Sequence, residues 1–320
     1  MLKRKLGRVE LSVTPLCLGG NVFGWTADEM SSFAVLDAYV DGGGNFIDTA
    51  DTYSTWLPGH VGGESESILG RWMSARKNRG RVIIATKVGS RMGTAPNAQG
   101  LSRRYILEEV EASLKRLQTD YIDLYQAHRD DPHTPLDETM AAFDDIVRQG
   151  KARYVGASNY NAVRLREALQ VSKQHGYVRY ESLQPPYNLV NRTEYERDLE
   201  ALCLEQGLGV ITYSSLASGF LSGKYRPGKD VPSSPRAKGI QERYMNEKGF
   251  SVLEQLDRVA AAHHATAAQV ALAWIMTRPG ITAAIASATS VEQLRELLGA
   301  VELSLNEEDM QSLDKVSAWR

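Results

Sequence analysis

Short apolar runs alternate with longer amphipathic segments along the chain. Eight runs rich in β-branched residues predict strands, at 14–20, 44–50, 81–87, 119–128, 152–158, 178–184, 209–214 and 281–287. Helical patterns follow most of them, near 28–41, 64–77, 102–117, 135–149, 161–175, 194–206 and 290–299. In one of these segments the apolar residues recur at steps of three and four, which places them on one helical face: Leu107, Val110, Leu114 and Leu117.

This strand-then-helix repetition predicts an α/β fold, a (β/α)8 TIM barrel, and we expect residues 1–320 to form one such domain. Continuous apolar strands fit a barrel because parallel strands are buried on both faces. A doubly wound open sheet is the alternative. Its dinucleotide-binding form has a GxGxxG motif after the first strand, whereas this chain reads GGNVFGW at that junction.

Three further segments fall outside the eight units. Residues 1–13, with Gly7 between KRKL and VELSV, predict an N-terminal β-hairpin that plugs one end of the barrel. Residues 215–250 include GKYRPGKDVPSSPRAKG and predict a long loop after the seventh strand, which we interpret as a lid. The segment near 266–277 includes TAAQVALAWIM, is apolar on nearly all sides, and predicts a helix of the core.

Composition narrows the class of protein. The chain has 37 Lys+Arg and 39 Asp+Glu, and this near-neutral balance gives no electrostatic footprint for nucleic acid or an anionic membrane. Its apolar runs are shorter than the ~20 residues of a membrane span, and its basic start lacks the apolar region of a signal peptide. Cys17 and Cys203 lie in apolar stretches and predict buried thiols in a reducing compartment. We therefore expect a cytoplasmic globular enzyme without nucleic-acid or membrane partners, and the sequence indicates no particular oligomeric state.

Three successive predicted strands end in ionisable residues. Asp48 ends the second strand, Lys87 the third and His128 the fourth, and each residue alone is typical of a turn, a surface or a core position. In a barrel the C-terminal ends of neighbouring strands meet at one rim, where catalytic residues are found. Tyr53 follows Asp48 by five residues and can bend back over the same rim.

This combination predicts proton transfer to a carbonyl oxygen. A tyrosine has a pKa near 10, and we expect the Lys87 ammonium to lower the pKa of Tyr53 while Asp48 keeps Lys87 charged. His128 is expected to orient the carbonyl group. These groups supply a proton but no electrons. Since no strong metal-ligand cluster is evident, we expect an organic hydride donor and no metal.

Six blocks resemble the signature sequences of the aldo-keto reductases, in the same order and over nearly the whole chain. They are GNFIDTADTY (44–53), IATK (84–87), LYQAH (124–128), YVGASNY (154–160), ESLQPPYN (181–188) and VITYSSLASGFLSGKY (210–225). The resemblance is closest to the bacterial branch with a long loop after strand seven, which also contains the potassium-channel β-subunits. It implies a barrel enzyme that reduces aldehydes or ketones to alcohols, or runs the reverse reaction, with a nicotinamide cofactor.

The resemblance also implies residue roles. The catalytic tetrad corresponds to Asp48, Tyr53, Lys87 and His128, with Tyr53 as acid/base. Ser158, Asn159 and Gln184 match positions that hold the nicotinamide carboxamide, and Tyr213 matches the aromatic residue that stacks on the ring. Further expected cofactor contacts are Gly20, at the end of the first strand, and Asp48. A pyrophosphate clamp is expected from Ser214, Leu216, Gly219 and Lys224.

One block, IASATSVEQLRELL (285–298), departs from the family pattern. Ser287, Ala288 and Thr289 replace the usual Gly-Ala-basic run, Leu297 stands where Asn is expected, and Gln293 is retained. We expect NADP(H), with NAD(H) as the alternative, and Ser287, Thr289 and Gln293 as contacts. Charge for a 2′-phosphate would then come from Arg236, Lys238 or Arg243 in the long loop.

Substrate contacts are expected from the loops at the same rim. The candidates are Phe23, Trp25, Tyr53, Trp56, His60, His128 and Arg129. Trp25 and Trp56 suit a sugar or an aromatic carbonyl, and their alternative role is to pack the loops together. Arg129 has the alternative of an ion pair with Asp130 or Asp131.

Two functional alternatives remain. The chain could be a nucleotide-sensing regulatory module like the channel β-subunits, or a barrel enzyme of unrelated chemistry. The second alternative requires phosphate-binding glycines after strands seven and eight, and the segment SGFLSGKY is similar to such a site.

Overall fold

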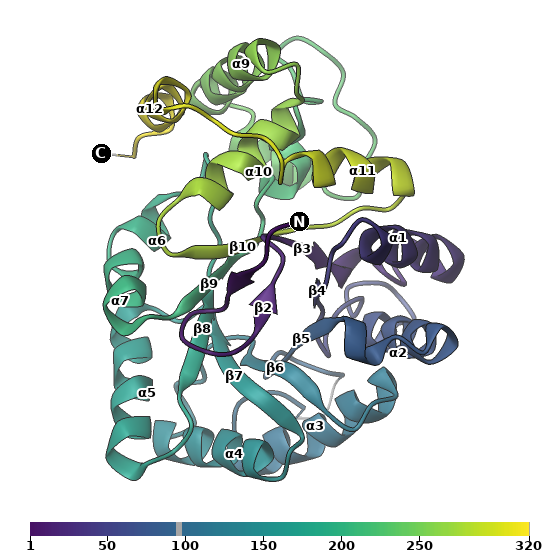
Figure 1. The fold of residues 1–320 in the computed structure, drawn as a ribbon, viewed down its shortest axis with the longest axis vertical. Helices are drawn as coiled ribbons and strands as arrows, with labels where there is room; N and C mark the ends of the chain where they lie inside the picture. Colours follow the sequence, from purple (N-terminus) through teal and green to yellow (C-terminus); the bar gives the residue numbers. More distant parts are fainter. Residues whose placement is uncertain (94–97, 320) are drawn as a thin grey trace.

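Eight strands form a ring with helices around its outside (Figure 1). The computed structural model describes residues 1–93 and 98–319. Parallel strands close a barrel in the order β10-β3-β4-β5-β6-β7-β8-β9, which confirms the predicted TIM barrel and is incompatible with an open sheet. The bounds are β3 (Leu16–Gly19), β4 (Phe46–Asp48), β5 (Ile83–Val88), β6 (Ile122–Ala127), β7 (Ala152–Ser158), β8 (Tyr180–Gln184), β9 (Gly209–Thr212) and β10 (Ile281–Ala286).

The helices that connect and cover the strands agree with most of the predicted segments. They are α1 (Glu29–Asp41), α2 (Glu64–Arg76), α3 (Arg103–Leu117), α4 (Leu136–Arg148), α5 (Ala162–His175), α6 (Thr193–Glu196), α7 (Leu199–Gln206), α8 (Ala237–Tyr244), α9 (Glu247–Ala262), α10 (Ala267–Thr277), α11 (Val291–Gly299) and α12 (Glu307–Val316), with the 3-10 turns η1 (Gly20–Val22), η2 (Arg79–Arg81) and η3 (Ala217–Ser222). Side-chain caps begin several of them, because Asp28, Ser102 and Asn161 each accept a backbone N–H of the first turn. Within the described ranges, no helix has the length and apolar character needed to span a membrane.

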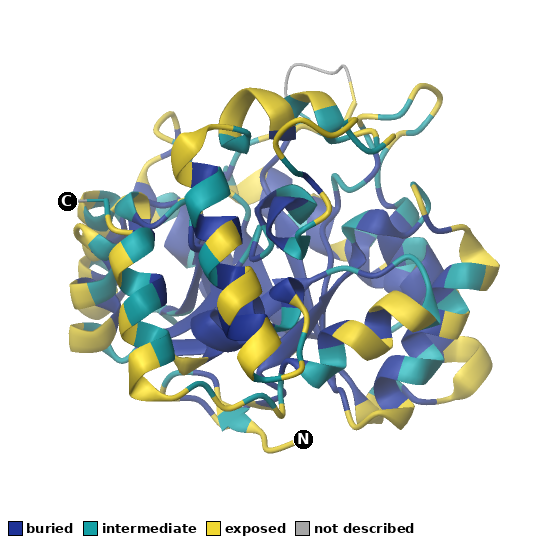
Figure 2. Cartoon of the chain, turned by 90° about the horizontal axis from the view of Figure 1, so that it is seen from above, coloured by how far each residue is buried: buried dark blue, intermediate teal, exposed yellow. Residues whose placement is uncertain are grey.

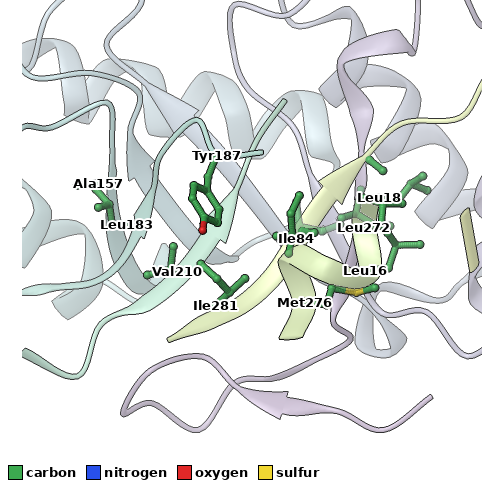
Figure 3. Close-up of a cluster of buried hydrophobic side chains, with 14 of the residues drawn as sticks. Leu16, Leu18, Ile84, Ala157, Leu183, Tyr187, Val210, Leu272, Met276 and Ile281 are labelled. Carbon is green, nitrogen blue, oxygen red and sulfur yellow. The ribbon is translucent and has the colours of Figure 1, made fainter. Parts of the chain in front are cut away.

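Alternation along the strands divides the core into two layers. Cys17, Phe46 and Ala85 belong to the inner layer, whereas Leu16 and Ile47 belong to the outer layer under the helices. Figure 3 shows part of the outer layer, in which strand side chains such as Leu16 and Leu18 accompany Leu272 and Met276 of α10. The predicted core helix is confirmed, since most residues of α10 are buried. Figure 2 shows that the strands at the centre are buried and that the helices are exposed on their outer sides.

The predicted N-terminal hairpin is confirmed. It consists of β1 (Arg4–Lys5) and β2 (Ser12–Val13), paired antiparallel, and lies in front of the ring in Figure 1. Gly7 turns the hairpin with a φ of +57°, and a Cβ there would lie 2.6 Å from the Gly209 nitrogen, so only glycine fits. Leu6, Val9, Leu11 and Val13 join the inner layer and close the end of the barrel opposite the C-terminal ends of the strands.

The prediction of one long loop over 215–250 was wrong in part. This segment contains η3, α8 and the beginning of α9, and extended chain is confined to its middle. The segment of α8, AKGIQERY, is polar and contains a glycine, and its single buried residue, Ile240, anchors it. Neither α9 nor α12 was predicted from the sequence. Leu253 and Leu256 bury the apolar face of α9, which packs against α10 and α12.

Candidate active site

The same alternation brings the predicted polar residues to one end of the barrel. Asp48 lies two positions after Phe46, and Lys87 two positions after Ala85, so each follows a residue of the inner layer. His128 comes directly after β6, and its backbone N–H donates to the Val88 carbonyl at 2.8 Å. The strand ends therefore place the three side chains at one rim, as expected.

A chain of hydrogen bonds joins three members of the predicted tetrad. Lys87 Nζ donates to Asp48 Oδ2 at 2.8 Å and to the Tyr53 hydroxyl oxygen at 2.9 Å. The Tyr53 hydroxyl donates to the same Asp48 oxygen at 3.1 Å, and Gln184 Nε2 donates to Asp48 Oδ1 at 2.8 Å. Lys87 and Asp48 are almost completely buried. His128 completes the group, because its ring centre lies 6.1 Å from that of Tyr53.

The expected lowering of the Tyr53 pKa was wrong. Burial raises the pKa of Tyr53 well above its ordinary value, and the Asp48 charge and hydrogen bond raise it further. Sequence reasoning gave Asp48 only the role of keeping Lys87 charged and left out its effect on Tyr53. In the structure the carboxylate that balances Lys87 also accepts the phenolic proton, so Tyr53 remains protonated at neutral pH.

His128 is neutral at the rim. Burial, with the positive charges of Lys87 and Arg129, lowers its pKa well below 6.5. Its Nδ1 atom is buried and has no hydrogen-bond partner among the residues that the structure describes. A neutral imidazole with an unused nitrogen can donate to, or accept from, a bound polar group.

A cavity of about 680 Å³ opens beside the tetrad, a size within the usual range for ligand sites. The predicted cofactor residues that line it are Asp48, Ser158, Asn159, Gln184, Tyr213, Ser214, Leu216, Gly219 and Ser287. The Tyr213 hydroxyl donates to Asn159 Oδ1 at 2.8 Å, and Asn159 Nδ2 donates to the His128 carbonyl at 2.9 Å. These bonds hold the Tyr213 ring in the wall of the cavity.

Four predicted cofactor residues are not part of the cavity lining. Gly20 is buried against Ser65 and Phe23, and Lys224 is exposed after η3. Gln293 Oε1 accepts from the backbone and the hydroxyl of Thr289 at 2.9 and 3.0 Å, so these two residues bind each other.

The loop that runs from the end of β9 into the first residues of η3 has an unusual backbone. Ala217, Ser218 and Gly219 have positive φ values in succession, and Gly219 reaches +102°. Left-handed residues in such loops can turn backbone N–H groups toward a common anion. Ser214, Leu216, Ser218 and Gly219 face the cavity, so this loop is suited to a phosphate group.

Several lining residues were missed by sequence reasoning, among them Gly19, Asn21, Ser215, Ser218 and Pro235. Asn21 Oδ1 accepts from the Ser287 hydroxyl at 2.6 Å, a contact between the two ends of the barrel sequence that no local pattern indicates.

Arg236 reaches the cavity from the long segment after β9. Its guanidinium lies 5.0 Å over the Trp25 ring, and burial lowers its pKa from the usual value. In the part of the chain that the structure covers, Arg236 has no ion pair. It was named from the sequence as a source of charge for a phosphate, whereas Lys238 and Arg243 are exposed on α8 and do not line the cavity.

The predicted substrate residues separate into two groups. Trp25, Trp56 and Arg129 line the cavity, and the two indole rings meet edge to face with centres 5.3 Å apart. Phe23 is fully buried in the hydrophobic core, so the prediction of a substrate contact there is corrected. His60 lies outside the cavity, with Nδ1 3.6 Å from Glu64.

The alternative ion pairs proposed for Arg129 are absent. Asp130 is held by Arg164, with distances of 2.8 and 3.0 Å, and Asp131 accepts the Leu101 backbone N–H at 2.8 Å.

The residues present fit a nicotinamide dinucleotide. Ser158 and Asn159 offer donors and acceptors near the tetrad, Tyr213 offers a flat ring, and the loop around Gly219 and the Arg236 guanidinium offer two places for phosphate. The described residues contain no group of three or more His, Cys, Asp or Glu side chains that could hold a metal ion.

Comparison with known proteins gives consistent matches. The model of the aldo/keto reductase family matches residues 15–318. The uncharacterized oxidoreductase YrpG of Bacillus subtilis (strain 168) is 37% identical over 316 residues, which cover 97% of this chain and 94% of that protein. The aldo-keto reductase AFTS1 of Alternaria alternata is 35% identical, with coverage of 99% and 91%. A probable voltage-gated potassium channel subunit beta of Oryza sativa subsp. japonica is 34% identical, with coverage of 95% and 92%.

Proposed function

Because the chain belongs to the aldo/keto reductase family of oxidoreductases, we propose that it reduces aldehydes or ketones to alcohols, or catalyses the reverse, with NADP(H) and with Tyr53 as acid/base. The observation that carries this proposal is the hydrogen-bonded chain Asp48–Lys87–Tyr53 at the rim of the cavity. When bound, the reduced nicotinamide supplies the hydride that the carbonyl carbon receives. The side chains of the protein supply the proton that the carbonyl oxygen receives.

Tyr53 acts as the proton donor. Its O–H turns from Asp48 Oδ2 to the carbonyl oxygen and donates its proton there. The carbonyl carbon gains the hydride and the oxygen gains the proton, which gives the alcohol. Lys87 continues to donate to the phenolic oxygen and stabilises the phenolate, while Asp48 keeps Lys87 charged. A proton from water then restores the phenol.

The electrostatics of the site favour reduction at neutral pH. A raised pKa keeps Tyr53 in the protonated form that a donor needs. Neutral His128, at the same rim, is placed to hydrogen-bond the carbonyl oxygen and to orient it toward Tyr53. The reverse oxidation requires the phenolate and therefore a higher pH.

Arg236 supports NADP(H) over NAD(H). It is a cation without an ion pair among the described residues, and it lines the same cavity as Ser287 of the departing block. A guanidinium can bind a 2′-phosphate through two hydrogen bonds, which would compensate for the missing basic residue after Ser287.

A second candidate function comes from the relatives. The rice protein, 34% identical, carries the name of a probable channel subunit, so a nucleotide-sensing regulatory module is the alternative. Such a module would bind the nucleotide without requiring turnover of a carbonyl compound. Turnover therefore separates the two candidates.

The test is a Tyr53→Phe variant, with Tyr177→Phe, at a half-buried tyrosine that neither lines the cavity nor belongs to the tetrad, as the matched control. Titration with NADPH and NADH, followed by fluorescence, should show tighter binding of NADPH, equal in wild type and both variants. Turnover of an aldehyde panel, followed by nicotinamide absorbance, should fall about 10²–10⁴-fold in Tyr53→Phe only. Equal turnover by wild type and Tyr53→Phe would end the proposed role of Tyr53. Nucleotide binding without turnover in wild type would favour the sensing module.

A further inference from the structure

A second cavity adjoins the first across the tetrad. It has a volume of about 430 Å³, and the two cavities share Tyr53, Trp56, His128 and Arg129 as a common boundary. A molecule whose carbonyl oxygen lies between Tyr53 and His128 can therefore extend into this second space. The second cavity does not include the loop at Gly219 or Arg236, so it is separate from the groove suited to the nucleotide.

The walls of this second cavity combine apolar surface with hydroxyl groups and positive charge. Thr52, Thr55 and Ser90 contribute hydroxyls, and Arg91 and Arg129 contribute charge. Its described lining residues include no acidic side chain. Ser90 is only 6% exposed, and its hydroxyl has no hydrogen-bond partner in the described part of the chain, a condition that a bound polar group would relieve.

Arg129 is the cation at the junction of the two cavities. The acid beside it, Asp130, is held by two hydrogen bonds from Arg164. Asp131 accepts the Thr134 hydroxyl at 2.7 Å as well as a backbone N–H. Arg129 itself forms neither a hydrogen bond nor an ion pair through its side chain with another described residue. Its positive charge contributes to the low pKa of His128, which agrees with its place next to the reacting group.

We infer that the substrate is a carbonyl compound with an anionic group, a carboxylate or a phosphate, which Arg129 binds at the mouth of the second cavity while Ser90 bonds a polar atom further inside. This inference rests on the proposed function. A guanidinium recognises either anion through two parallel hydrogen bonds, and the wall hydroxyls favour a polar linker between carbonyl and anion. Trp56 covers the non-polar side of that linker.

The experiment compares charged aldehydes with neutral aldehydes that share the same reacting group. One pair is 4-carboxybenzaldehyde and its methyl ester, and the other is glycolaldehyde phosphate and glycolaldehyde. In wild type we expect kcat/KM to be about 10- to 100-fold higher for the charged member of at least one pair, and this ratio to fall as salt is added. The pair that shows the preference identifies the anion as carboxylate or phosphate.

Variants then assign the preference to one residue. Arg129→Gln should bring the charged-to-neutral ratio close to one, and Arg129→Lys should retain part of it, because a lysine keeps the charge without the planar pair of donors. Arg81→Gln, which removes an exposed guanidinium just before β5 at the opposite end of the barrel, should keep the wild-type ratio. A ratio that survives in Arg129→Gln overturns the inference.

The failure of this inference can be told from the failure of the proposed function. If neutral aldehydes are reduced and neither pair shows a preference for the anion, the anionic substrate is wrong and the reductase proposal stands. If none of the four compounds is reduced, both are wrong. Binding of 4-(hydroxymethyl)benzoate to the NADP+ complex gives a second readout without turnover, and Arg129→Gln should weaken it about tenfold or more.

Discussion

Two clusters of titratable residues lie on opposite faces of β5. The rim cluster consists of Asp48, Tyr53, Lys87 and His128, and the rear cluster of Asp51, Glu66, Glu109 and Arg116, between β5, α2 and α3. Neighbouring residues of the strand connect them. Lys87 points inward to Asp48, whereas the hydroxyl of Thr86 donates to Glu66 Oε1 at 2.5 Å on the outer side.

The two clusters differ in their balance of charge. In the rim cluster one lysine faces one carboxylate, whose two oxygens accept from Lys87, Tyr53 and Gln184. In the rear cluster three acids share one arginine. Arg116 donates to Glu66 at 2.6 Å and also to Glu109, while Asp51 Oδ2 is buried without a hydrogen-bond partner among the described residues.

The difference has a direct effect on protonation. Burial raises the pKa of Asp51 well above its ordinary value, and the charges of Glu66 and Glu109 raise it further. Burial alone would lower the pKa of Arg116, but the same two carboxylates raise it above its usual value. A buried charge is therefore no sufficient mark of a reactive group. The rim cluster is set apart by its matched cation and by the cavity onto which it opens.

The largest effect is expected from removing the cation of the rim cluster. Lys87→Met leaves the Asp48 carboxylate buried without its positive partner and the phenolic oxygen of Tyr53 without its donor. Turnover should fall about 10²–10⁴-fold, and the free energy of unfolding at pH 7 by roughly 3–5 kcal/mol. Aldehyde turnover and urea unfolding measure the two effects.

The pH dependence gives this prediction a second signature. Without Lys87, Asp48 takes up a proton more readily in the folded state, so the stability lost in Lys87→Met should be larger at pH 8 than at pH 5. Lys115→Met on the exposed side of α3 is the control and should change neither stability nor turnover appreciably. A Lys87→Met protein with wild-type turnover would contradict the assignment of the rim cluster.

An effect on stability alone is expected from the rear cluster. Arg116→Met leaves Glu66 buried with only the Thr86 hydroxyl, which should cost roughly 3–5 kcal/mol of unfolding free energy. Turnover per folded molecule should change far less than in Lys87→Met, because none of the rear-cluster residues lines either cavity.

A double variant sharpens this result. Adding Glu66→Gln to Arg116→Met removes the unpaired charge and should recover part of the lost stability. If Arg116→Met lowered turnover as strongly as Lys87→Met, the two clusters would have to be regarded as one functional unit.

The fold was largely predictable because the strands carry local signals. Short apolar runs rich in β-branched residues located the eight barrel strands, helical periodicity located helices such as α3, and a long apolar segment located α10; all three signals depend on near neighbours in the sequence. The helix α8 escaped prediction because its polar, glycine-containing segment is held by the packing of Ile240, a contact that depends on the folded chain. The same applies to α12, whose one fully buried residue is Leu313.

The candidate site was predictable where it rests on strand register and less so elsewhere. Asp48, Lys87 and His128 follow from their positions at strand ends. The hydrogen bond from Gln184 to Asp48 was not predicted, because the two residues lie 136 positions apart; this bond helps to determine how the carboxylate acts on Tyr53. The rear cluster gave no signal, because Glu66 and Arg116 look like ordinary helix-surface charges until α2 and α3 pack together.

The last effect in this comparison, expected from Asp51→Asn, is a change in how stability depends on pH rather than a loss of turnover or of stability. Asn keeps the acceptor that Asp51 Oδ1 offers to the Thr52 N–H, at 2.6 Å, and cannot ionise. In wild type the folded-state pKa of Asp51 is raised. At a pH between its unfolded-state pKa near 3.9 and its folded-state pKa, the folded protein therefore holds a proton that the unfolded chain has lost. Wild-type stability therefore falls as pH rises through this window, by at most about 1.4 kcal/mol per pH unit from this group.

Asp51→Asn lacks this dependence, so its stability relative to wild type should improve steadily from pH 4 upward. Urea unfolding of both proteins between pH 4 and pH 8 measures the difference, with Asp120→Asn on the surface as control. Parallel stability curves for wild type and Asp51→Asn would mean that Asp51 ionises normally in the folded protein. The rear cluster would then hold a third negative charge, and its contrast with the rim cluster would be one of position only.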